Sequence, residues 1–117
     1  MKSHKFLLGV LSLVSLLSAC SGEPSEANLR TAVETELTDL NNYHKQVGGP
    51  QVSDSDLIKL HGLKKSECVK DTDEPGFSCA VELDLEAPYM RPGKHQRQLK
   101  VVKSDGGWHV VSGLQGN

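Results

Sequence analysis

The stretch FSCAVELDLE, residues 77–86, decides the fold. Phe77, Leu85 and every second residue between them are apolar or cysteine, whereas the intervening residues are small or acidic. Strict alternation is typical of a half-buried strand with one face on a core and the other toward water. We therefore expect a strand here, with Glu82, Asp84 and Glu86 on its wet face.

The segment before this strand reads as its hairpin partner. Residues 71–76, DTDEPG, form a turn by composition, and a strand is expected over residues 57–69. Cys68 and Cys79 would then face each other across the hairpin, and an even cysteine pair in an oxidising compartment predicts a disulfide. A redox or metal pair is the alternative, but the spacing is not Cys-x-x-Cys. Residues 53–56, SDSD, either cap a short helix or form a polar turn, and the turn is preferred.

Two further strands follow. Tyr89–Gly93 reads as a connection, Gln96–Lys103 as a third strand and Ser104–Gly107 as a tight turn into a fourth. The side chains expected on the buried face are Leu99, Val101, Trp108, Val110 and Ser112.

A helix precedes the strands. Ser25 suits the N-cap, Glu26 suits the first turn, and residues 48–50, GGP, end the helix. An apolar stripe follows helical spacing through Leu29, Ala32, Val33, Leu37, Leu40 and Tyr43. The polar face carries Arg30, Glu34, Thr38 and Asn41. The fold prediction is α+β: one N-terminal helix packed on a four-stranded antiparallel meander, forming a single domain over residues 26–117.

The N-terminal residues read as a leader. A basic start is followed by a 12-residue apolar stretch, Phe6 to Leu17, which suits a signal peptide and is too short to span a bilayer. Residues 17–20, LSAC, resemble the lipobox of bacterial lipoproteins. The resemblance implies a cleaved signal peptide over residues 1–19, a lipid on Cys20 and a short tether over residues 20–25. The alternative is an ordinary secretory signal with a chance cysteine.

Location follows from the same resemblance. Two or more acyl chains on Cys20 would anchor the protein stably. Ser21 stands where aspartate signals inner-membrane retention in enterobacteria, so the resemblance implies an outer-membrane lipoprotein facing the periplasm. The short tether predicts a domain close to the bilayer.

Charge and motifs exclude several functions. Removing Lys2 and Lys5 from the 13 basic residues leaves 11 against 15 acidic ones, a formal net charge of −4. That balance argues against a nucleic-acid partner. The histidines lack metal-binding spacing, and nucleophile and phosphate-loop motifs are missing. The acidic run at residues 71–74 lacks the EF-hand pattern, so a solvated turn is preferred to a cation site. We expect no enzyme activity, cofactor or metal.

The mature chain has a further resemblance. A leading amphipathic helix, a Cys-to-Cys hairpin and the closing motif KSDGGWHV, Lys103 to Val110, look like small bacterial lipoproteins of cystatin-like or NTF2-like architecture. The single helix fits the cystatin-like version better. Many such proteins have no assigned activity, so the resemblance implies a fold more than a function.

One loop stands out as a candidate partner-binding site. Tyr89, Met90 and Arg91 lie between two prolines, and these residue types are enriched in protein interfaces. The alternative is a plain connection whose tyrosine folds back on the sheet. The leading hypothesis is a lipoprotein that binds a protein as an accessory component of an envelope or secretion assembly. The alternatives are an inhibitor or immunity lipoprotein against a periplasmic hydrolase, and a small-ligand-binding lipoprotein.

Overall fold

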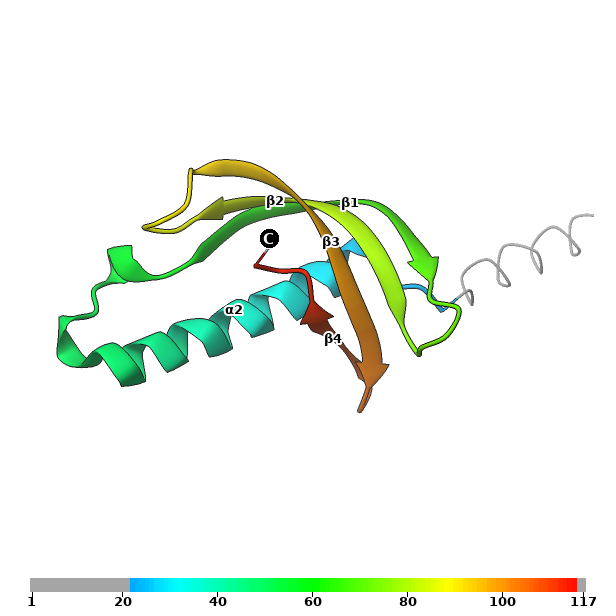
Figure 1. The fold of residues 1–117 in the computed structure, drawn as a ribbon, viewed down its shortest axis with the longest axis horizontal. Coiled ribbons are helices and arrows are strands. Elements are labelled where there is room, and N and C mark those ends of the chain that lie inside the picture. Colours follow the sequence, from blue (N-terminus) through cyan, green and yellow to red (C-terminus); the bar gives the residue numbers. More distant parts are fainter. Residues whose placement is uncertain (1–21, 116–117) are drawn as a thin grey trace, which may run out of the picture.

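A computed structural model describes residues 22–115 of the chain. One long helix, α2 (Glu26–Gly48), lies across one face of a curved four-stranded sheet (Figure 1). The strands are β1 (Lys59–Lys70), β2 (Phe77–Glu86), β3 (Gly93–Ser104) and β4 (Gly107–Ser112), and they pair antiparallel in the order β1-β2-β3-β4. The predicted α+β fold of one helix on a four-stranded meander is therefore confirmed. The predicted signal peptide and Cys20 lie outside the described residues.

Helix α2 begins where the sequence predicts. The Ser25 hydroxyl accepts a hydrogen bond from the backbone N–H of Asn28, and the Asn28 side chain accepts one from the N–H of Ser25. Such reciprocal capping satisfies two N–H groups that the first turn leaves without helical partners. The helix ends at Gly48, and Gly49 follows with φ 72°.

The helix buries only its N-terminal half against the sheet. The residues of the stripe that are fully buried are Leu29, Ala32, Val33 and Leu37. The last turns of α2 extend past the ends of the strands (Figure 1), so Tyr43, expected in the buried stripe, is 67% exposed. Asn41, expected on the polar face, is instead half-buried.

The core lies between α2 and the sheet. The alternating residues of β2 from Cys79 to Leu85 are buried, as predicted, and so are Leu99 and Val101 of β3. Trp108 and Val110 of β4 pack half-buried against this cluster.

The end of β4 departs from the predicted alternation. Val101 pairs with Val110, but Lys100 pairs with Ser112, so β4 carries one extra residue at this point. Such a bulge reverses the faces of the residues beyond it, and Ser112, expected to be buried, is exposed. Gly113, at φ 97°, then turns the chain so that Leu114 enters the core.

The link between α2 and β1 also differs from the prediction. It contains two single-turn 3-10 helices, η1 (Gly49–Gln51) and η2 (Asp54–Asp56). Ser53 is the N-cap residue of η2, and the Asp56 carboxylate accepts hydrogen bonds from its backbone N–H at 2.8 Å and from its hydroxyl at 3.1 Å. The short-helix interpretation of residues 53–56 was therefore right and the preferred polar turn wrong.

Candidate functional site

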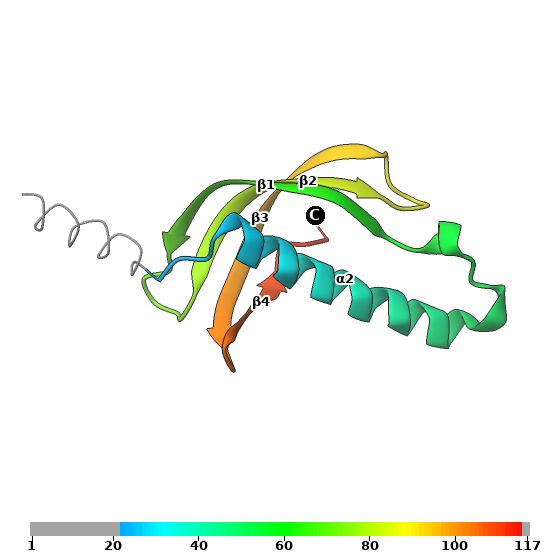
Figure 2. The ribbon, with the colours of Figure 1, turned by 180° about the vertical axis from the view of Figure 1, so that it is seen from behind.

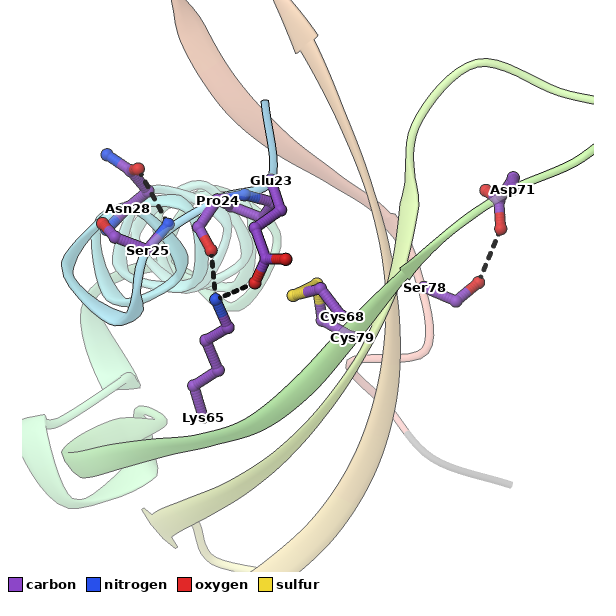
Figure 3. Close-up of a disulfide and its surroundings, with 9 residues drawn as sticks. All are labelled: Glu23, Pro24, Ser25, Asn28, Lys65, Cys68, Asp71, Ser78 and Cys79. Atoms are coloured by element: carbon purple, nitrogen blue, oxygen red, sulfur yellow. Dashed lines mark hydrogen bonds and ion pairs between the residues drawn. A yellow bond between two sulfur atoms is a disulfide. The ribbon is translucent and has the colours of Figure 1, made fainter. Parts of the chain in front are cut away.

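The predicted cysteine pair braces the first hairpin. Cys68 and Cys79 are direct partners in the β1–β2 register and are joined by a disulfide. Cys79 is fully buried, and the sulfur atoms lie on the side of the sheet where Glu23 and Pro24 pack (Figure 3). This environment supports a structural role for the bond.

The predicted binding loop divides into an inner and an outer part. The Met90 N–H donates to the Ala87 carbonyl oxygen at 3.3 Å, which closes a turn after β2. Within this turn Met90 packs against the core cluster, whereas Tyr89 is fully exposed and Arg91 is exposed. The alternative in which the tyrosine folds back on the sheet is wrong. The loop presents Tyr89 and Arg91, and Met90 anchors it.

A groove of about 430 Å³ lies between this loop and the last turns of α2. Its residues come from four segments, namely α2 (Leu40, Asn41, Tyr43, His44), the link before β1 (Asp56, Ile58), the loop after β2 (Ala87, Pro88, Tyr89, Met90) and Gln115 near the end of the chain. Tyr43 and Tyr89 are both strongly exposed, so the groove is open at its rim. We call this set of residues the distal groove.

A side-chain amide fixes one wall of the distal groove. The Asn41 Nδ2 group donates to the Ile58 carbonyl oxygen at 2.9 Å, and Asn41 Oδ1 accepts from the Ile58 N–H at 2.9 Å. The amide thereby replaces a strand partner for Ile58, just before β1 begins. These two hydrogen bonds hold the residue that leads into β1 against α2.

The groove also carries one fixed charge. Hydrogen bonds from the backbone and side chain of Ser53 lower the pKa of the Asp56 carboxyl below its ordinary value, and His44 adds to the effect. Asp56 is therefore a carboxylate at neutral pH. The groove combines an apolar surface, two tyrosines and one negative charge.

The distal groove lies at the end of the molecule away from Gly22, where the described chain begins. The described chain enters beside the first turn of α2, whereas the residue 87–92 loop and the end of α2 lie at the other end (Figures 1 and 2). Of the residues that line the distal groove, only those of the loop are predicted from the sequence to form a binding site. The helical spacing predicts Tyr43 in the core, and no pattern in the sequence indicates that α2 extends past the ends of the strands.

The acidic turn between β1 and β2 forms ion pairs with Lys100 of β3. Lys100 Nζ lies 2.9 Å from Asp71 Oδ2 and also contacts Glu74, while the Ser78 hydroxyl donates to Asp71 Oδ1 at 2.8 Å (Figure 3). Lys100 and Ser78 lower the pKa of Asp71, and hydrogen bonds to Glu74 and Asp71 raise the pKa of Lys100. The carboxylates of Asp71 and Glu74 are thus engaged in holding the turn to β3.

The wet face of β2 carries hydrogen-bonded carboxylates. Glu86 contacts His61 at 2.9 Å, and the hydrogen bond from His61 lowers the pKa of Glu86. Glu82 accepts a hydrogen bond from Gln96 at 3.0 Å. Within residues 22–115, no group of three or more histidine, cysteine or acidic side chains is gathered in a way that could hold a metal ion. Over the same residues, no helix is long and apolar enough to cross a membrane.

Comparison of the chain with models of protein families, with curated protein sequences and with solved structures found no match.

Proposed function

We propose that this chain is a lipid-anchored lipoprotein of the outer membrane, facing the periplasm, which works by binding another protein through the distal groove. The lipobox-like sequence at residues 17–20 supports the anchor. The domain begins only a few residues later, since Pro24 is already fully buried. The groove then lies at the end farther from the anchor, where a periplasmic protein has access to it.

One observation carries the proposal of protein binding. Tyr89 is fully exposed, and Tyr43 (67%) and Val47 (70%) are exposed at the same end of the molecule. Exposed apolar and aromatic side chains gathered beside a groove mark interaction sites, and tyrosine is enriched at interface hot spots. We infer that the partner inserts an apolar side chain between Tyr43 and Tyr89, beside a basic group that pairs with Asp56.

An accessory component of an envelope or secretion assembly is the leading form of this function. Its expected mark is an exposed apolar patch, which Tyr43, Val47 and Tyr89 supply. An inhibitor or immunity lipoprotein is the second form, favoured by the projection of Tyr89 from a loop bounded by prolines. A small-ligand carrier is disfavoured, because the groove is open at Tyr43 and Tyr89 rather than enclosed.

Photocrosslinking in intact cells tests the proposal. A photoreactive amino acid replaces Tyr89 in one strain and Tyr43 in another, and exposed Thr35 of α2 is the matched control. We expect one protein to be crosslinked from both groove positions and not from Thr35. Its identity then separates an assembly component from a hydrolase. Equal crosslinking from all three positions, or none from the groove at native abundance, would overturn the proposal.

A further inference from the structure

The end of the domain nearest the N-terminus carries a second surface. Gly22, the first described residue, lines a depression of about 260 Å³. Its other residues are Lys70, Pro75, Gly76, Phe77, Lys103 and Trp108. The β1–β2 and β3–β4 turns also lie at this end, away from the distal groove (Figure 2). We call Lys70, Phe77, Lys103 and Trp108 the anchor-end patch.

The patch repeats one pairing in both hairpins. Lys70 pairs across the strands with Phe77, and its Nζ lies 5.3 Å from the ring centroid. Lys103 pairs likewise with Trp108, with Nζ 5.9 Å from the ring centroid. The two rings meet edge to face, with centroids 5.8 Å apart. Both lysines are exposed and both rings are half-buried.

The chain just before α2 is fastened to the sheet beside this patch. Lys65 Nζ lies 2.5 Å from Glu23 Oε2 and 2.7 Å from the Pro24 carbonyl oxygen (Figure 3). The Lys65 N–H also donates to Glu26 at 3.1 Å. Only Ser21 and Gly22 separate Cys20 from this fixed point. At full extension such a link reaches about 10 Å.

We propose that the anchor-end patch rests on the phosphate headgroups of the leaflet that holds the lipid on Cys20. This inference rests on the proposed function, because it requires that lipid. Tryptophan combines an apolar ring with a polar N–H and concentrates at membrane interfaces, where lysine reaches the headgroups with its stem lying along apolar surface. The patch offers both features within reach of the anchor.

The contact needs the anchor, not a net positive charge. Asp71 and Glu74 beside the patch are paired with Lys100, but Asp73 and Asp105 are exposed at the same turns. Free in solution, the domain would therefore bind a bilayer weakly. A short link raises the effective concentration of the patch at the headgroups to the millimolar range. A weak contact is then occupied, and the domain has one orientation with the distal groove outward.

Tryptophan fluorescence tests the proposal directly, because Trp108 is the only tryptophan in the chain. The mature lipoprotein is purified from membranes and reconstituted into phosphatidylethanolamine and phosphatidylglycerol vesicles that contain a headgroup nitroxide lipid. We expect the loss of most of the Trp108 emission. The control carries Trp108→Phe with Tyr89→Trp, which moves the probe to the distal groove and should lose little emission.

A charge variant tests the lysines while keeping the probe. Lys70→Glu with Lys103→Glu should weaken quenching of Trp108, whereas Lys45→Glu with Lys94→Glu, at exposed positions away from the patch, should not. Circular dichroism verifies that both variants fold.

Flotation with the vesicles tests the lipid anchor separately from the contact of the anchor-end patch with the headgroups. Failure to float contradicts the lipid anchor and the patch with it. Flotation with Trp108 unquenched, or with both probes quenched equally, overturns the patch alone.

Discussion

The ammonium group of Lys65 lies 2.5 Å from a carboxylate oxygen of Glu23, which joins β1 to the residues that lead in from the N-terminus. The Lys65 side chain is only 18% exposed. Removing one partner of an ion pair that is partly shielded from water costs more than breaking a surface pair, because the other charge is left poorly solvated. Within the described residues, the packed structure therefore includes Glu23, three residues before α2 begins.

Removal of this ion pair should loosen the N-terminal segment. Lys65→Met keeps the apolar stem but loses the bonds to Glu23 and the Pro24 carbonyl. We expect a loss of about 1–2 kcal/mol in the free energy of unfolding, measured by urea denaturation. Lys64→Met, the exposed neighbour, is the matched control and should change little. Equal losses in the two variants would contradict the role given to Lys65.

The side-chain amide of Asn41 should contribute more to the stability of the domain than a residue on the polar face of a helix usually does. Asn41→Ala leaves both backbone groups of Ile58 without their side-chain partner. The expected loss is about 1–3 kcal/mol, because part-buried polar groups are costly to leave unpaired. Thermal unfolding measures this loss. Asn42→Ala, at an exposed neighbouring position, should be close to neutral in the same measurement. A neutral Asn41→Ala would show that Ile58 is held by other contacts.

The disulfide should supply much of the stability of a domain this small. Reduction of Cys68–Cys79, or the double change Cys68→Ala with Cys79→Ala, should cost about 3 kcal/mol in the chain-entropy model. Thermal unfolding with and without reductant measures the effect. The double variant should show no response to reductant. A wild-type protein equally indifferent to reductant would contradict this prediction.

The Asp71–Lys100 pair should limit stability at both ends of the pH range. The pKa of Asp71 is lowered, so its contribution is complete above its ordinary value of 3.8 and is lost as pH falls through the lowered value. The pKa of Lys100 is raised, so its contribution is complete below 10.5 and is lost as pH rises through the raised value. Unfolding free energies measured from acid to alkaline pH check both limits. Asp71→Asn should reduce the loss of unfolding free energy at acid pH. An unchanged loss would argue against this pair.

Alternation and turn chemistry were enough to predict most of the fold. The pattern of residues 77–86 places β2, and the same reasoning finds β3, β4 and the cysteine pairing because each strand buries one face. The capping residues of α2 are local, so Ser25 and Gly48 mark its limits correctly. These features depend on residues close together in the sequence.

The differences come from contacts between distant segments. Helical spacing places Tyr43 in the core, but the last turns of α2 extend past the strands (Figure 1), and Tyr43 is exposed. Asn41 is drawn inward by Ile58, 17 residues later. The bulge that exposes Ser112 arises from pairing with β3 and has no local signature. The candidate groove combines four such segments, so only its loop could be predicted from the sequence.

Mass spectrometry of the mature protein's N-terminus tests the central claim, that this domain is held in a membrane by Cys20. We expect a mature chain that begins at Cys20, carries acyl groups on it and fractionates with membranes. Cys20→Ala should abolish both the acylation and the membrane fractionation. A mature chain that begins elsewhere, or that carries an unmodified Cys20, would contradict the lipid anchor and the orientation derived from it.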